Sequence, residues 1–231
     1  MIVATATDLV LCAIDAGSGR ARFGPKLSYA LPVAELCDLV QGGSVRLDGD
    51  HLAPQPGATG DPAAALTELD QARGPLTVPD WVRLRGPHCI DRYLIAAVDA
   101  GVVQVVDHNG RKVLRVADAG PIDQVTRRLL TVLDDPEPGF ADAAFVLLAD
   151  IARVARTHLH GRDNRKRRTR LSALRHAAGS GSDGDAVLRT GINAAVRLSR
   201  LAGTDPRTID KQIGLTPDVK AAAPFLGGGA R

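Results

Sequence analysis

Apolar positions recur every three to four residues over most of the chain, which is the spacing of one helix face. The stretch 26–41 shows this spacing clearly, and Gly42 and Gly43 follow it, where glycine permits the left-handed turn that ends many helices. We expect the strongly apolar stretch 140–154 to form a central core helix. The same spacing predicts further helices over 7–14, 63–69, 89–100, 121–133, 162–178 and 185–201, with a short one around Trp81.

Two short regions alternate apolar and polar residues instead, as the strands of a half-buried sheet do. The first surrounds a turn at 48–50. In the second, the valine-rich stretches 102–106 and 112–116 flank Asn109 and Gly110, and an Asn-Gly pair between apolar strands is a strong hairpin signal. The chain is therefore predicted to be mainly α, a single helical domain with two small β-hairpins.

We expect this domain to span residues 1–201 of the 231, followed by a partly mobile tail, 202–231, that is rich in glycine, proline and alanine. With 45% hydrophobic residues the chain can build a packed core. It has no run of about 18 apolar residues and no secretory signal, so we predict a cytoplasmic protein. Its three cysteines are far apart among apolar residues and are expected to be buried free thiols: Cys12, Cys37 and Cys89.

The net charge of +3 is unevenly distributed, since residues 1–160 carry −5 and residues 161–231 carry +8. Such asymmetry indicates an anionic partner. A dense cluster of basic residues between 161 and 170 is either a solvated helix face or a patch for anionic lipid, nucleic acid or an acidic protein. Each basic residue near an anionic membrane contributes about 1 kcal/mol. The cluster, here called the basic segment, contains Arg162, Arg165, Lys166, Arg167, Arg168 and Arg170.

Other function classes find less support in the sequence. The predicted helix 89–100 and the hairpin after it resemble half of a winged helix, but the helix has Arg92 as its only basic residue against Asp91 and Asp99, so nucleic acid is a poor partner. The chain has no Gly-x-Ser-x-Gly, phosphate-binding glycine loop or His-Glu-x-x-His motif. We therefore predict no cofactor and no metal, and whether the chain is an enzyme stays open.

Several short motifs follow one another in a recognisable order. They are DLVL at 8–11, LSYAL at 27–31 with ELCDL at 35–39 and VRL at 45–47, ATGD at 58–61, DWV at 80–82, and AGV at 100–102 before the hairpin. In this order and spacing the chain resembles the Golgi phosphoprotein 3 family, in particular its bacterial, actinomycete-type members. The resemblance extends over about residues 7–201.

The resemblance implies a mostly helical, non-enzymatic protein. Eukaryotic members of the family bind phosphatidylinositol 4-phosphate on Golgi membranes and hold the tails of resident enzymes. Their hairpin serves self-association or membrane insertion, which would fall here on Val113 and Leu114. Their headgroup pocket uses a tryptophan, which falls on Phe23, and three arginines, which fall on Pro32 and near Pro87 and Ile90.

None of these three replacements can donate a side-chain hydrogen bond to a phosphate. The resemblance therefore places a degenerate headgroup site at Phe23, with Lys26 and Arg92 as nearby cations. Our leading hypothesis is an adaptor that binds anionic lipid at the inner face of the plasma membrane, with a possible protein partner or self-association through the 102–116 hairpin. Two alternatives remain, a small-molecule binding or catalytic member of a specialised pathway and, less favoured, a winged-helix DNA-binding protein.

Overall fold

The computed structural model describes residues 5–55, 74–108, 111–159, 164–177 and 182–202. The predicted helix 63–69, the Asn109 and Gly110 turn, Arg162 and most of the expected tail lie outside these described residues. Within them the chain forms helices α1 (Thr5–Cys12), α2 (Pro25–Gln41), α4 (Val78–Asp99), α5 (Gly120–Asp134), α6 (Phe140–Ile151), α7 (Ala155–His158), α8 (Arg165–Ala177) and α9 (Asp183–Ala202).

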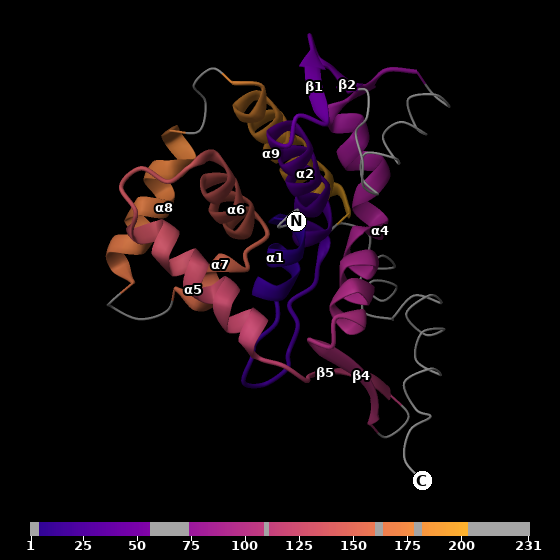
Figure 1. Cartoon of the computed structure of the whole chain (residues 1–231), viewed down its shortest axis with the longest axis vertical. Coiled ribbons are helices and arrows are strands. Elements are labelled where there is room, and N and C mark those ends of the chain that lie inside the picture. Colours follow the sequence, from indigo (N-terminus) through magenta and orange to yellow (C-terminus); the bar gives the residue numbers. More distant parts are fainter. Residues whose placement is uncertain (1–4, 56–73, 109–110, 160–163, 178–181, 203–231) are drawn as a thin grey trace.

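Helix α2 runs through the middle of the molecule, with α4, α6 and α9 packed around it (Figure 1). Its side chains are buried on all sides, including Leu27, Leu31 and Leu36, each with no exposed surface. A helix that is apolar all round can be stable only in such a position. The stretch predicted to be the central core helix is α6, and it is buried from Ala144 to Asp150, but it shares that place with α2.

Two small antiparallel sheets flank the helices. Strands β1 (Val45–Asp48) and β2 (His51–Pro54) form the first predicted hairpin, and β3 (Leu76–Thr77) extends it to a third strand. Strands β4 (Val103–His108) and β5 (Arg111–Val116) form the second hairpin, as predicted. The sequence did not indicate β3, because two residues are too few to show an alternating pattern.

Residues 78–99 form the single helix α4, so the prediction of two helices, a short one at Trp81 and another over 89–100, is wrong. The helix begins at a capping box, in which the Asp80 amide donates to the Thr77 hydroxyl at 3.3 Å and the Thr77 amide donates to the Asp80 carboxylate at 3.4 Å. Pro87 inside α4 cannot donate a backbone hydrogen bond. Packing against α2 holds the helix together there: the Ser28 hydroxyl donates to the Gly86 carbonyl, and the Trp81 indole donates to the Pro32 carbonyl at 3.1 Å.

The predicted fold class is confirmed: over its described residues the chain is mainly helical with two small antiparallel sheets. None of the helices that the structure describes combines the length and the apolar character that crossing a membrane requires. The predicted buried thiols are also confirmed, since Cys12, Cys37 and Cys89 are free and buried.

Candidate anion site at the start of helix α2

Helix α2 begins without a side-chain cap. Its N-cap residue is Gly24 in an extended conformation, and Pro25 occupies the first turn. The backbone amides at the start of a helix carry a partial positive charge, equivalent to about half an elementary charge. Phe23 lies just before this helix end and packs against the core while remaining partly exposed. The two residues assigned to a headgroup site by resemblance, Phe23 and Lys26, therefore both lie at the positive end of α2.

The structure adds three arginines to this end of α2. The pKa of Lys26 is lowered, first by partial burial and then by the positive charges of Arg153, Arg156 and Arg200. These residues come from three other places in the chain, since Arg153 follows α6, Arg156 lies on α7 and Arg200 lies near the end of α9. The three arginines are exposed and Lys26 is half-buried. Basic side chains that converge from several elements are the usual way to hold a phosphate or carboxylate group.

Arg153 has an unusual backbone conformation. Its φ angle is 64°, and it has the one positive φ among the non-glycine residues that the structure describes. It lies two residues beyond the end of α6, where its amide donates to the Asp150 carbonyl at 2.9 Å and the Val154 amide donates to the Ala149 carbonyl at 2.9 Å. This is the Schellman motif, whose left-handed residue is usually glycine. Arg153 therefore has a backbone conformation that is unfavourable for residues other than glycine.

A buried carboxylate supports one of these cations. The Arg156 Nε lies 3.4 Å from an Asp150 carboxylate oxygen, and the Asp150 side chain is 2% exposed while that of Arg156 is 65% exposed. Asp150 thus fixes the base of the Arg156 side chain but leaves most of its guanidinium in solvent. Lys26 and these three arginines, together with Phe23, are called the α2 anion site below.

Arg92, the third residue assigned to the headgroup site, takes part in a different cluster. It lies on α4, and its guanidinium is 3.9 Å from Glu35, whose side chain has no exposed surface. Arg85 binds the same carboxylate through two hydrogen bonds of 3.2 and 2.9 Å, and the Tyr93 hydroxyl donates to it at 2.9 Å. The Arg85 guanidinium also lies over the Trp81 ring, 5.0 Å from its centre. The structure therefore does not place Arg92 with Phe23 and Lys26.

The small-molecule alternative would require a pocket between α2 and α4. The cluster around Glu35 fills this contact. The Gly86 backbone packs so closely on Tyr29 that a Cβ at this glycine would lie 2.3 Å from the tyrosine ring. Burial, reinforced by the charge of Glu35, raises the pKa of both Tyr93 and Cys89. Both groups are therefore neutral at physiological pH, and the thiol is a poor nucleophile. The arrangement is a structural network and not a reactive centre.

The basic segment divides into two groups. Arg165 and Lys166 are exposed at the start of α8. The next three arginines make contacts within the fold. Arg167 donates to the Asp134 carboxylate at 2.9 Å, Arg168 to the Leu159 carbonyl at 2.8 Å and Arg170 to the Asp135 carbonyl at 3.2 Å. Half of the segment therefore holds α8 against its neighbours.

Among the side chains of the second hairpin that the structure describes, one large apolar residue is exposed. Val102 and Val103 lie in the core, and Leu114 is half-buried against it. Val113 is 40% exposed, and Leu201 on α9 is 61% exposed. The backbone of β5 also lies close to the loop between α1 and α2, since a Cβ at Gly19 would lie 3.4 Å from the Leu114 carbonyl oxygen. The predicted interaction residues thus differ, with Val113 outward and Leu114 mainly part of the fold.

Sequence reasoning missed Arg153, Arg156 and Arg200 because they lie more than a hundred residues from Lys26 along the chain. The sequence pattern did not mark Arg153 either, because it predicts a helix that continues through this residue to residue 154, whereas α6 ends at Ile151. Within the described ranges, no group of three or more His, Cys, Asp or Glu residues could hold a metal ion.

The fold and the site together define a class of protein. It is a mainly helical domain with two small antiparallel sheets and a cationic end on its central helix. Comparison with protein families assigns it more closely: the Golgi phosphoprotein 3 (GPP34) family model matches residues 6–197, and the chain belongs to this family. The match extends from the first helix to near the end of α9. No curated protein matches the chain.

Proposed function

We propose that this protein is a non-enzymatic adaptor that binds anionic membrane lipid, and that the α2 anion site holds a phosphate-bearing headgroup. The observation that carries the proposal is that the positive charges of Arg153, Arg156 and Arg200 lower the pKa of Lys26 at the uncapped start of a helix. These positive charges repel one another, and a bound anion offsets that repulsion. A helix start adds its own partial charge and backbone donors to such a site.

The backbone of Arg153 supports a role for its side chain in binding. Residues held in sparsely populated conformations concentrate at functional sites, where the surrounding structure holds them in place. Glycine would satisfy the turn after α6 without strain, so the turn itself does not require arginine. A contribution of the guanidinium to anion binding accounts for its presence at this position.

The exposed part of the basic segment adds a second, non-specific attraction. Arg165 and Lys166 are exposed on α8 and would each contribute about 1 kcal/mol near an anionic membrane. This attraction weakens with salt over a screening length of about 8 Å at physiological ionic strength. We place the protein in the cytoplasm, in reversible contact with the inner face of the plasma membrane. We also propose that Val113 on the β4–β5 hairpin contacts a protein partner or a second copy of the chain.

The test is co-flotation with vesicles of three compositions: phosphatidylcholine alone, phosphatidylcholine with phosphatidylglycerol, and phosphatidylcholine with phosphatidylinositol 4-phosphate. Each is run at low and at physiological salt. We expect binding to both anionic mixtures and none to the neutral vesicles. Stronger binding to the phosphoinositide at physiological salt would show that the site discriminates between headgroups.

Variants assign the binding to the site. Arg153→Gln with Arg200→Gln removes two cations from the α2 anion site, whereas Arg46→Gln with Arg127→Gln removes two exposed arginines elsewhere. We expect the first pair to reduce flotation at least tenfold and the second pair to leave it within about twofold. An equal loss of flotation in the two double variants would show that binding depends on net charge alone, and it would refute the α2 anion site. No flotation of the unaltered protein with any anionic vesicle would refute the lipid-binding function.

A further inference from the structure

The last turns of α9 and the first turn of α4 enclose a surface groove of about 450 Å³. It is called the α4–α9 groove below. On α9 its lining residues recur at every third or fourth position, so they lie on one face of the helix. The lining combines apolar side chains with arginines. The residues on which the argument depends are Pro79, Arg83, Ala194, Arg197, Leu198 and Leu201.

Leu201 is the most exposed large apolar side chain that the structure describes, at 61%. Leu198 lies one turn earlier on the same face of α9 and packs partly against the core. A single exposed leucine needs no explanation, but Leu201 continues the apolar part of a groove. An apolar surface of this kind is typical of a place where a protein contacts another protein or a membrane.

Arginines surround Leu201 and identify the kind of partner that fits. Arg197 lies four residues before it on the same helix face, and Arg200 precedes it directly. Both are exposed, and Arg83 lines the groove from α4. Asp80, the acidic residue of the lining, lies 3.0 Å from the Arg83 guanidinium, so the surface keeps an excess of positive charge. Exposed apolar side chains among arginines are typical of helices that lie at an anionic membrane surface.

This groove adjoins the α2 anion site. Asp183 at the start of α9 accepts from the Leu47 amide of β1, which follows the end of α2, so α9 runs back along α2 toward its start (Figure 1). Arg200 belongs to the α2 anion site, and its Cα lies about 3.8 Å from that of Leu201. A bilayer is flat and much wider than a helix, so a bilayer that contacts Arg200 also reaches Leu201.

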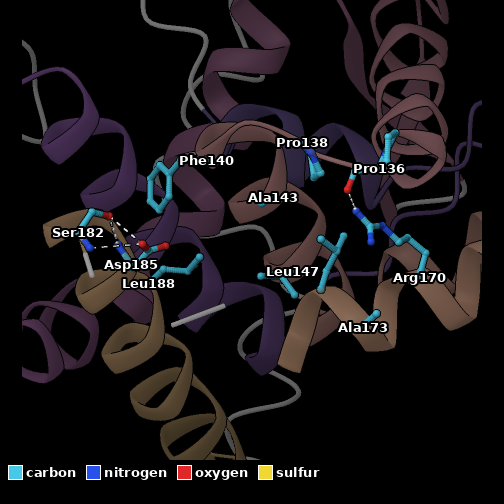
Figure 2. A pocket seen from close by; sticks show the side chains of 11 residues that line it. Pro136, Pro138, Phe140, Ala143, Leu147, Arg170, Ala173, Ser182, Asp185 and Leu188 are labelled. Carbon is cyan, nitrogen blue, oxygen red and sulfur yellow. Dashed lines mark hydrogen bonds between the residues drawn. The ribbon is translucent and has the colours of Figure 1, made fainter. Parts of the chain in front are cut away.

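A second cavity, of about 470 Å³, lies between the turn before α6, α8 and the start of α9 (Figure 2). Its lining has one basic and one acidic residue, and both make contacts within the fold. Arg170 donates to the Asp135 carbonyl at 3.2 Å, and the Asp185 carboxylate accepts from the Ser182 hydroxyl at 2.9 Å. This cavity therefore has no excess of positive charge, and it provides a comparison surface for the test below.

We propose that the α4–α9 groove docks on an anionic bilayer and that Leu201 inserts among its headgroups. This inference rests on the proposed lipid-binding function and adds to it the side chain that enters the apolar layer. Arg197 and Arg200 hold the phosphates, because arginine side chains keep their charged ends at the headgroups while their aliphatic parts lie beside an apolar neighbour. Leu201 then leaves water for the boundary of the acyl chains.

Leu201→Trp in the full chain tests the insertion directly, since tryptophan is favoured at the membrane interface. The vesicles contain phosphatidylglycerol and phosphatidylcholine with brominated acyl chains, because bromine quenches tryptophan fluorescence at short range. The unaltered protein is the blank, since its single tryptophan, Trp81, has no exposed surface. We expect the added fluorescence to shift to shorter wavelength and to be quenched by the brominated lipid.

Ala173→Trp is the matched control, because Ala173 is exposed on α8 and lines the second cavity. We expect its fluorescence to keep its intensity in the same vesicles. Quenching at residue 173 but not at residue 201 would turn another face toward the membrane and overturn the proposal. A Leu201→Trp emission that depends on protein concentration without vesicles would show that a second copy covers Leu201, and it would also overturn the proposal.

Flotation of the same proteins separates this inference from the lipid-binding function. Leu201→Gln should weaken flotation about tenfold, because it removes an apolar side chain that would leave water on binding. Ala96→Gln places the same side chain at an exposed position of α4 outside the groove and should leave flotation within about twofold. Normal flotation of Leu201→Gln would refute the insertion alone. Absence of flotation by the unaltered protein would refute the lipid-binding function and the insertion together.

Discussion

Glu35 on α2 and Arg85 on α4 face each other across the contact between the two helices. Both oxygens of the Glu35 carboxylate accept from the Arg85 guanidinium, at 3.2 and 2.9 Å. The Glu35 side chain has no exposed surface and that of Arg85 is 18% exposed. Close to the positions where the family resemblance places phosphate-binding arginines, this protein therefore has an arginine that is already neutralised by an internal carboxylate.

Replacing Glu35 alone should destabilise the protein strongly. Glu35→Leu leaves the positive charge of Arg85 partly buried without its partner, and we expect the free energy of unfolding to fall by about 3 kcal/mol. Adding Arg85→Met removes that charge, so the double variant should be more stable than Glu35→Leu alone. Urea unfolding measures both. Arg83→Met is the control, because the exposed pair of Arg83 with Asp80 should contribute less than about 1 kcal/mol.

Arg153→Gly should separate stability from binding. Glycine adopts the positive φ angle without strain, so we expect the free energy of unfolding to rise by about 0.5–1 kcal/mol. The same substitution removes one cation of the α2 anion site and should weaken flotation with anionic vesicles. Arg153→Lys keeps both the strain and the charge, so its stability and binding should stay close to those of the unaltered protein. Unchanged vesicle binding by Arg153→Gly would exclude this side chain from the site.

Asp38 should make stability depend on pH. Burial is the main cause that raises the pKa of Asp38 from 3.8 to about 6, against the lowering effect of the hydrogen bonds from Thr5. The folded state therefore binds this proton more tightly than the unfolded state, and the stabilisation is lost as pH rises from about 4 to about 6. Asp38→Asn should flatten the curve over that range. It also loses one of the two hydrogen bonds from Thr5, because an amide offers one acceptor oxygen where the carboxylate offers two.

Urea unfolding at intervals between pH 3.5 and pH 7.5 measures this effect. Part of the slope should persist in Asp38→Asn, because burial also raises the pKa of Asp8, against the opposing charge of Arg128. An Asp38→Asn variant with the same pH dependence as the unaltered protein would show that Asp38 titrates at its ordinary pKa in the folded state.

Gly86→Ala should be costly although it adds a single methyl group. The new Cβ would lie 2.3 Å from the Tyr29 ring, so the Tyr29 side chain or one of the two helices has to move. Overpacking of this kind costs about 1–3 kcal/mol. Gly24→Ala is the matched control, because nothing lies within 4 Å of a Cβ at Gly24. Thermal unfolding compares the two variants. Equal changes in melting temperature would mean that the α2–α4 contact rearranges around Gly86 at little cost in stability.

The basic segment should separate into a stability group and a binding group. Arg167→Glu places a carboxylate against Asp134 in place of an ion pair and should lower the melting temperature. Arg165→Glu with Lys166→Glu changes exposed side chains and should leave the melting temperature unchanged while reducing salt-sensitive vesicle binding. If both sets of substitutions lowered stability equally, Arg165 and Lys166 would also have to contribute to the fold.

Periodicity predicted most of the fold because the apolar stripes that define the helices are local features of the sequence. It failed where distant contacts decide the outcome. Gly86 and Pro87 indicate a break in α4, but hydrogen bonds and close packing from α2 keep the helix continuous. The α2 anion site was only half predicted, since Lys26 is local to the helix start whereas Arg153 and Arg200 reach it through the tertiary fold.

The continuity of α4 also fixes a distance within the molecule. The helix connects directly to β3 at one end and, after a short turn, to β4 at the other, and its 22 residues span about 33 Å at 1.5 Å per residue. Its weakest point, at Gly86 and Pro87, is braced against α2. The helix therefore holds the two small sheets a fixed distance apart, and a substitution that bent it at Gly86 would change that distance.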